Sequence, residues 1–453
     1  MQATKSRPRF EVVADGMGIV SHVGAALLSE LSDRLGLTQE LGRRANRGVR
    51  AGSHDRGVVL RDLVVMLADG GDCVSDLCTL RQQPELFGEV CSASTAWRVL
   101  VEEVGADPRG TAGLWSALAR IRERAWTLGA APTGPLRIDL DATLIQAHSD
   151  KQGAAGTYKG GFGFHPLGAW LDRGDGTGEA LAGVLRPGNA ASNTAADHRD
   201  VLAMALLALP KPLRDQPILI RADSAGATHA FTDDIVGRNL WFSIGFDCDT
   251  RVQAAILALP EQAFTPALDD HGRPRPGAWV AELAGLDLAS SGWPEGTRAI
   301  CRRERPHPGA RHKMGFTDQH GHRFQAFITN QPDPDPAILE ARHRPHAHVE
   351  DRIRTAKATG LRNLPLSDFA ANDAWLTLVM IAQTLVCWAQ ALLLDDHDLK
   401  VAEPKTLRYR LWHVAGRIIH HARRMIVRLD RTWPWANELA AAFTRLRALP
   451  ARC

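Results

Sequence analysis

The chain has 453 residues, more than one ordinary core holds, so two or three domains are expected. Hydrophobic residues make up 45% of the chain and charged residues 23%, a balance typical of globular proteins in water. We see no run of about eighteen apolar residues and therefore expect no membrane span. The first segment, Met1–Phe10, is basic and lacks the apolar stretch of a signal peptide, which predicts a cytoplasmic protein.

The seven cysteines are scattered and form no CxxC pair, which favours reduced thiols over a disulfide framework or a zinc cage. The net charge of +3 is unevenly distributed. From Lys400 onwards, twelve lysines and arginines stand against three acids. A basic end on a balanced chain predicts a polyanionic partner, although a solvated helix face explains any single arginine in it.

Residues 1–130 are predicted to be mainly helical, because apolar residues recur at three- and four-residue spacing in 19–37 and 57–80. Ser94 is a suitable N-cap for a short helix that carries Arg98. A short capped helix with an exposed arginine is typical of a DNA-reading helix. We therefore predict that Arg98 contacts DNA, with plain packing of this helix as the alternative.

A strand is predicted in the stretch 136–145, where apolar and polar residues alternate from Leu136 to Asp141. Asp141 ends the polar series of this strand. Because a rigid strand holds its side chains in place, Asp141 is a candidate metal ligand. A solvated sheet edge is the alternative interpretation.

Further elements follow in chain order. We expect strands at 160–170 and 178–185, a helix at 194–209, a strand at 217–222, a helix at 228–236 and a strand at 240–246. Three antiparallel strands followed by two helix–strand units is the ribonuclease H-like order. It places Asp141 and Asp223, at the end of the strand 217–222, on adjacent central strands.

Residues 250–340 are rich in Pro, Gly and His and contain predicted strands at 298–303 and 323–329. We interpret them as a β-rich insertion between two halves of one sheet domain. Trp293 lies in a Ser-Gly-Trp-Pro loop of this insertion and is a candidate for stacking on a base, with core packing as the alternative.

A helix is predicted to begin at Pro345, because proline suits the first helical turn. Glu350 and Lys357 then share one face, and His346 and Arg354 each lie four residues from Glu350. A solvated helix with ordinary ion pairs is one alternative. Zinc binding by His343, His346 and His348 is another, and their irregular spacing argues against it.

Together these residues resemble the DDE transposases of bacterial insertion sequences, and more narrowly the insertion sequence 1380-like group. In that branch the last acid lies in a Tyr-x2-Arg-x3-Glu-x6-Lys signature, and a β-rich insertion splits the ribonuclease H-like core. Asp141, Asp223 and Glu350 match the three acids, and Lys357 matches the lysine. His343 and His346 stand where that branch has Tyr and Arg, which puts the phosphate contacts of those two positions in doubt.

The resemblance implies an α/β fold, with a ribonuclease H-like mixed sheet interrupted by the insertion. The implied division is a helical DNA-binding region at 1–130, core parts at 131–249 and 341–399, the insertion at 250–340, and a helical basic region at 400–453.

The implied activity is metal-dependent DNA cleavage and strand transfer at terminal inverted repeats, by cut-and-paste. We predict that Asp141 bridges two Mg²⁺ ions, for which Mn²⁺ can substitute, and that Asp223 and Glu350 hold one ion each. Lys357, Arg354 and His346 are expected to contact phosphates. The expected partners are the terminal repeats, target DNA and a second copy of the chain, with no membrane. The alternatives are a nuclease without strand transfer and a DNA-binding copy that no longer cuts.

Overall fold

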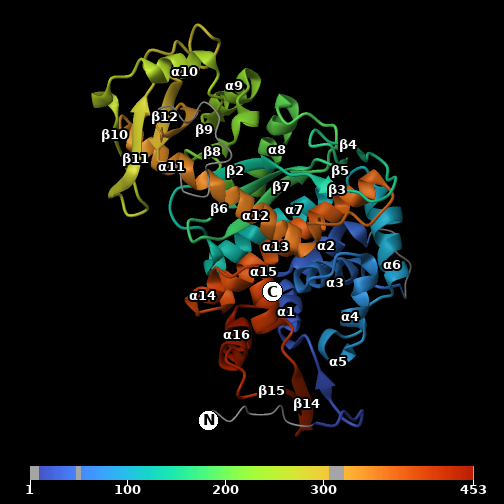
Figure 1. Ribbon diagram of the computed structural model, residues 1–453. Helices are drawn as coiled ribbons and strands as arrows, with labels where there is room; N and C mark the ends of the chain where they lie inside the picture. The colour runs from blue at the N-terminus through green and yellow to red at the C-terminus, as the bar shows by residue number, and fades with distance from the viewer. Residues whose placement is uncertain (1–9, 47–52, 306–320, 452–453) are drawn as a thin grey trace.

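The structure is a computed structural model, and it describes residues 10–46, 53–305 and 321–451. Nearly all of the basic segment Met1–Phe10 therefore lies outside the described residues, as does Arg452. Figure 1 shows an elongated molecule, in which a central sheet separates a β-rich end from a projecting C-terminal hairpin.

One sheet of nine strands organises the chain. In spatial order its strands are β10 (Thr265–Leu268), β11 (Pro274–Glu282), β12 (Arg298–Glu304), β13 (Arg323–Thr329), β9 (Trp241–Phe246), β8 (Leu219–Ala222), β2 (Arg137–Ala142), β6 (Leu167–Asp172) and β7 (Gly178–Val184). Strands β2, β8 and β9 are parallel neighbours, and every other neighbouring pair is antiparallel. The predicted order of three antiparallel strands and two helix–strand units is thus observed.

The strand predicted at 160–170 is divided. Its first part is β5 (Phe162–Phe164), which pairs with β3 (Ile145–Gln146) and β4 (Ala155–Gly156) in a separate small sheet. Its second part is β6 of the large sheet. Pro166 lies between the two parts and has no N–H to donate to a ladder, which accounts for the break.

The segment 250–340 contributes β10 to β13 and helix α10 (Thr250–Leu257). Its last strand, β13, pairs with β9 of the central strands. The strands described in this segment therefore extend the central sheet.

Helices cover both faces of the sheet (Figure 1). Helix α8 (Ala195–Ala208) packs on β2, β6 and β7, and α9 (His229–Gly237) leads into β9. On the other face lie α12 (Val349–Ala356) and α13 (Phe369–Leu393). Gly168 of β6 marks this contact, because a Cβ there would lie 2.8 Å from Met380 Cε of α13.

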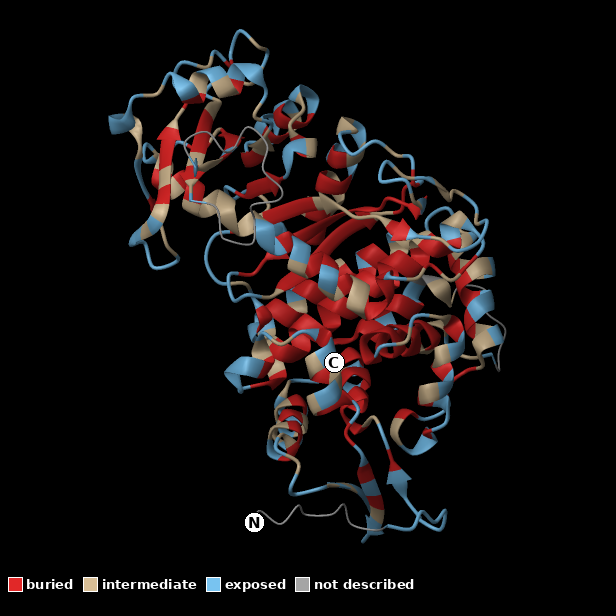
Figure 2. Cartoon of the chain, in the orientation of Figure 1, coloured by how far each residue is buried: buried red, intermediate tan, exposed pale blue. Residues whose placement is uncertain are grey.

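Helix α13 is long and apolar enough to cross a membrane, with a mean hydropathy of 1.8 in its most apolar window. This helix was overlooked in the sequence, and the absence of a membrane span stays a prediction. That window is 89% buried inside the structure, and Figure 2 shows α13 within the buried centre. This burial is what the core helix of a globular protein shows, because the apolar side chains are already removed from water.

The N-terminal region packs against α13. Its helices are α1 (Val23–Leu35), α2 (Leu37–Ala45), α3 (Arg56–Asp69), α4 (Cys78–Arg81), α5 (Pro84–Phe87), α6 (Ala93–Arg98) and α7 (Gly110–Ala125). The N-cap of α6 is Ser92, whose side chain accepts a hydrogen bond from Thr95 N, so the assignment to Ser94 is wrong. Ser92 has the extended backbone that a cap requires, whereas Ser94 already lies in the first turn.

The C-terminal region is not all helical, contrary to the prediction. It contains α14 (His397–Lys400), α15 (Pro404–Leu407) and α16 (Ala436–Ala448), but also a hairpin of β14 (Gly416–His421) and β15 (Arg424–Leu429). β14 also pairs with β1 (Ile19–Val20). The isoleucines of both strands favour extended structure. Ala422 and Arg423 form the turn with φ of 46° and 64°, so the glycine or asparagine that usually marks such a turn is absent.

Buried ion pairs join the N-terminal helices to the sheet. The fully buried Glu179 of β7 accepts hydrogen bonds from Arg122 Nε of α7 and from Trp126 Nε1, both at 2.9 Å. Arg173 Nη1 donates to the same carboxylate. One carboxylate thus satisfies donors from two helical segments and the β6–β7 connection.

We predict that Glu179→Gln lowers the free energy of unfolding by about 3–5 kcal/mol, because it leaves two buried arginines without their counter-charge. Urea unfolding measures this loss. The exposed Arg251 pairs with Asp249 at 3.2 Å, and Arg251→Gln serves as the control with an expected loss below about 1 kcal/mol. Equal losses in the two variants would contradict this role of Glu179.

Candidate active site

Asp141 and Asp223 lie side by side at the carboxyl ends of two parallel strands. Leu140 of β2 is paired with Ala222 of β8, so the residue that follows each of them lies at the same edge of the sheet. One Asp141 oxygen accepts a hydrogen bond from Ala142 N at 2.7 Å, and Asp223 Oδ1 accepts one from Ala225 N at 3.1 Å. The predicted placement on adjacent central strands is therefore observed.

Glu350 approaches the same edge from helix α12. Asp223, His346 and Glu350 line one cavity of about 570 Å³. Asp141 is directly opposite Gly168 of β6, the glycine that contacts α13. The helix that carries Glu350 therefore lies on the same side of the sheet as both aspartates.

The electrostatics of Asp141 show how close the three acids are. Burial, together with the negative charges of Asp223 and Glu350, raises the pKa of Asp141 to about 7, against the opposing effects of His346 and the Ala142 N–H. The three carboxylates supply hard oxygen donors of the kind that a divalent cation prefers. The residues present therefore fit a metal site.

The acids do not form a tight cage for a single ion. Within the described ranges, the groups of three ligands whose atoms all lie within 4.8 Å of one another are elsewhere in the chain. A pair of ions about 4 Å apart needs a wider set of donors than one ion does.

A buried charge network lies beneath the acids. Arg221 of β8 donates to both oxygens of Asp139 at 2.7 and 2.8 Å, and to Asp172 Oδ2 at 2.7 Å. Burial alone would raise the pKa of Asp139, but Arg221 and His346 hold it below its usual value. The alternative of a solvated sheet edge is thus wrong, because β2 is a central strand and Asp139 is buried.

His346 belongs to this network. Its Nδ1 lies 2.9 Å from Asp139 Oδ1, so the imidazole links the 3₁₀ turn before α12 to strand β2. The structure thus gives His346 a contact with a carboxylate where the sequence predicted a contact with phosphate.

The helix that leads to Glu350 starts earlier than predicted. Helix α11 (Pro336–His343) begins after the cap Asp335, and the chain continues through a 3₁₀ turn into α12. Pro345 lies at the start of that turn, so it does not begin the helix. Proline suits the first turn of any helical segment, because the N–H that it lacks would have no acceptor there. Pro345 therefore fits the start of the 3₁₀ turn and does not mark the start of the helix.

The three histidines of this segment do not form a zinc site. His343 Nδ1 lies 2.9 Å from Ser243 Oγ, and its ring stacks on Phe327 at 4.3 Å. His346 contacts Asp139, and His348 is exposed. Their different surroundings exclude a common metal ion in this arrangement.

Lys357 lies near the acids and Arg354 does not. Lys357 Nζ donates to Leu144 O at 3.2 Å, where burial lowers its pKa and Asp141 opposes that shift. Arg354 pairs with Asp351 at 2.5 Å and Glu403 at 3.2 Å, and it lines a different cavity. Arg354 therefore already has two carboxylate partners, which explains why its long side chain is directed away from Glu350.

Trp293 and Arg98 lie outside the cavity. Trp293 stacks on His229 at 4.3 Å and meets the edge of Phe246, which itself lines the cavity. Arg98 is exposed at the end of α6 and donates to Ser94 O at 3.4 Å. Trp293 is thus one side chain from the cavity, whereas Arg98 belongs to the N-terminal helices.

Three cavity residues were missed by the sequence analysis: Arg302, Arg323 and Arg344. Arg302 and Arg344 both bind the buried Glu340, at 2.7 and 2.6 Å. Arg302 also pairs with Glu304 and Arg344 with Asp270, so the charges of these two rim arginines are balanced by carboxylates. The three arginines of residues 298–304 were the available signal, but the sequence does not give the register that joins β13 to β9.

The sequence matches the family described as transposase DDE domain group 1 over residues 2–451. The chain belongs to this family. It is therefore a DNA transposase, an enzyme of transposition and DNA recombination, and DDE transposases use divalent metal ions. No curated protein matches the chain. A solved structure, the piggyBac transposase synaptic complex with hairpin DNA, is similar to this transposase with 10% identity and a TM-score of 0.37. The similarity covers 86% of this chain and 80% of that one, and it is too distant to say more about this transposase.

We predict that His346→Phe lowers DNA cleavage by about 10–100-fold, because a group that orients metal ligands typically contributes that much. The phenyl ring preserves the bulk but cannot contact Asp139. The change is measured as the cleavage rate at saturating metal. His348→Phe, two residues away and exposed, is the control and should keep its rate. Equal rates for both variants would contradict the role given to the His346–Asp139 contact.

Proposed function

We propose that this transposase cuts and rejoins DNA at the terminal inverted repeats of an insertion sequence by a cut-and-paste route. The observation that carries the proposal is the convergence of Asp141, Asp223 and Glu350 on one edge of the sheet. Asp141, coupled electrostatically to both other acids, is assigned to bridge two Mg²⁺ ions, with Asp223 and Glu350 on one ion each. Mn²⁺ is the expected substitute.

We assign the neighbouring residues to phosphate binding and to holding the acids in place. When bound, the two ions would activate the attacking oxygen and stabilise the leaving oxygen of an in-line displacement at phosphorus. Lys357 lies where it can neutralise a phosphate beside Asp141. The Asp139–Arg221 pair keeps β2 and β8 in register beneath the two aspartates.

The strand order supports a ribonuclease H-like core. Strands β7, β6 and β2 are antiparallel and are followed in space by β8 and β9, parallel to β2. The β-rich segment 250–340 stands between this core and α12, as expected for the insertion sequence 1380-like group. We also propose that the protein is bacterial and cytoplasmic and has no membrane partner, since α13 is buried in the core. A homodimer would hold two DNA ends together.

We assign the C-terminal hairpin to duplex DNA. Figure 1 shows that it projects from the body of the molecule. Its exposed arginines form no ion pair within the part of the chain that the structure describes: Arg417, Arg423, Arg424 and Arg428. Arg417 and Arg428 are directly opposite each other, an arrangement that repels unless an anion lies between them. A two-stranded ribbon also fits the width of a major groove.

The three acids should be individually essential. Asp141→Asn, Asp223→Asn and Glu350→Gln are each expected to lower cleavage of a terminal-repeat duplex by more than about a hundredfold, because each removes a metal ligand. Asp351→Asn is the matched control, since Asp351 is the next residue of α12 and binds Arg354. Cleavage rates in Mg²⁺ measure the effect. An Asp141→Asn variant that cleaves at the normal rate would overturn the assignment.

The same reaction separates strand transfer from hydrolysis. A duplex that carries the terminal repeat should give products joined to target DNA. Hydrolysed ends alone would favour the alternative, a nuclease of the same fold, and uncut DNA bound by the folded wild-type chain would favour a copy that no longer cuts.

The hairpin assignment predicts a change in salt dependence. Losing two phosphate contacts in the double variant Arg417→Ala, Arg428→Ala should reduce the slope of log affinity against log salt by about 2. Fluorescence anisotropy with a terminal-repeat duplex at several salt concentrations measures the slope. Arg238→Ala, which removes an exposed arginine paired with Asp234, is the control. A slope unchanged by the double variant would show that DNA lies elsewhere.

A further inference from the structure

A second cluster of metal-ligating side chains lies far from the acids in the sequence and in the fold. His22 precedes α1, Asp69 ends α3, and His413 precedes β14. One ligand atom of each lies within 4.8 Å of the other two. Three segments separated by tens to hundreds of residues thus bring two imidazoles and one carboxylate together.

The carboxylate of Asp69 is only partly satisfied. Its side chain is 5% exposed, and its Oδ2 lies 2.6 Å from His22 Nδ1. Its Oδ1 lies 3.2 Å from His413 Nε2 but has no hydrogen-bond partner among the described residues. His413 Nε2 instead makes its hydrogen bond to the backbone oxygen of Asp69, at 2.9 Å. A buried carboxylate oxygen without a partner is costly, and a bound cation would satisfy it.

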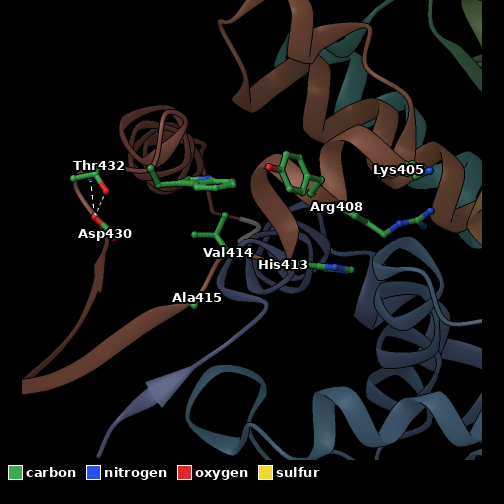
Figure 3. Close-up of a pocket in the computed structure, with 9 residues that line it drawn as sticks. Lys405, Arg408, His413, Val414, Ala415, Asp430 and Thr432 are labelled. Carbon is green, nitrogen blue, oxygen red and sulfur yellow. Dashed lines mark hydrogen bonds between the residues drawn. The ribbon is translucent and has the colours of Figure 1, made fainter. Parts of the chain in front are cut away.

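The backbone of His22 holds its ring at this place. His22 has φ of 57°, in the left-handed region that few residues other than glycine adopt. Its ring centroid is 4.3 Å from that of His413, and the ring planes are inclined by 43°. The two imidazoles therefore converge on one carboxylate from different sides, and Figure 3 shows His413 directed toward the N-terminal helices.

We propose that His22, Asp69 and His413 bind one Zn²⁺ ion. Two imidazole nitrogens and one carboxylate oxygen are donors that zinc accepts, and three protein ligands leave a fourth position for water or an anion. Tetrahedral zinc would separate its ligand atoms by about 3.3 Å, as bonds of about 2.0–2.1 Å require. The observed distances run to different oxygens of Asp69, 2.6 Å from His22 Nδ1 to Oδ2 and 3.2 Å from His413 Nε2 to Oδ1. Zinc would therefore require side-chain shifts around one of these oxygens, and His413 Nε2 would exchange its hydrogen bond to the Asp69 carbonyl for the metal.

The fourth position is supplied by a neighbouring cavity of about 550 Å³, which His413 helps to line (Figure 3). Arg408 and Lys405 also line it, and Arg408 Nη1 is held by the carbonyl oxygen of Ala358 at 2.9 Å. These cations face the site and oppose a second positive charge. They therefore favour an anion or a hydroxide at the open position of the zinc.

The ion would fix the base of the hairpin. His413 lies three residues before β14, His22 lies two residues after β1, and Val23 N donates to Val414 O at 3.1 Å. Asp69 anchors both to α3. Zinc would thus clamp the paired strands β1 and β14 onto the helical body. The site itself stands whether or not the hairpin binds DNA.

The test is zinc titration of the full-length chain after treatment with a chelator. It uses the background Asp141→Asn, Asp223→Asn, so that the acid site does not compete. We expect one Zn²⁺ per chain, a rise in the unfolding temperature with zinc, and a Co²⁺ absorption spectrum typical of tetrahedral nitrogen–oxygen ligation. His413→Gln and His22→Gln should each weaken binding by at least about tenfold. His420→Gln, an exposed histidine of β14, is the control.

Circular dichroism checks that each variant is folded. Absence of zinc binding by the folded background protein would overturn the proposal, and so would binding that His413→Gln leaves unchanged. Binding that falls equally in His420→Gln would also overturn it. Because none of these readouts involves DNA cleavage, a failure of the proposed function would leave the result intact.

Discussion

The buried pair between Arg221 and Asp139 is the interaction on which the active site depends. It joins the two central parallel strands two residues before Asp223 and two residues before Asp141. His346, in the turn that precedes α12, contacts the same Asp139 carboxylate. Such a pair adds little net stability, but loss of one partner leaves an uncompensated buried charge. Its effect here is to fix the relative position of three segments that each carry one acid.

This constraint explains why the acids can stay close without a ligand. The raised pKa of Asp141 comes first from its burial and then from the charges of Asp223 and Glu350, and strand pairing and the buried network hold the elements that carry these acids together. The protein thus contributes a fixed set of oxygen donors, as a metal site requires.

The sequence predicted the parts that depend on local pattern. Strands were predicted in 136–145 and 217–222, because alternation and apolar runs are local patterns, and the structure has strands at 137–142 and 219–222. The three acids were assigned from the resemblance to DDE transposases. The hairpin at 416–429 was missed because its turn, Ala422-Arg423, lacks the usual turn residues. The roles of His346 and Arg354 could not be predicted, because their partners Asp139 and Glu403 come from distant segments.

The central claim is that three acids distant in the sequence hold two metal ions in one site. A crystal structure of the transposase with Mn²⁺ and a terminal-repeat duplex tests it most directly, because anomalous scattering locates the ions. The account predicts two Mn²⁺ peaks about 4 Å apart, in contact with Asp141, Asp223 and Glu350. The claim would be contradicted if DNA is bound and the Mn²⁺ ions lie elsewhere, out of contact with one or more of these three carboxylates.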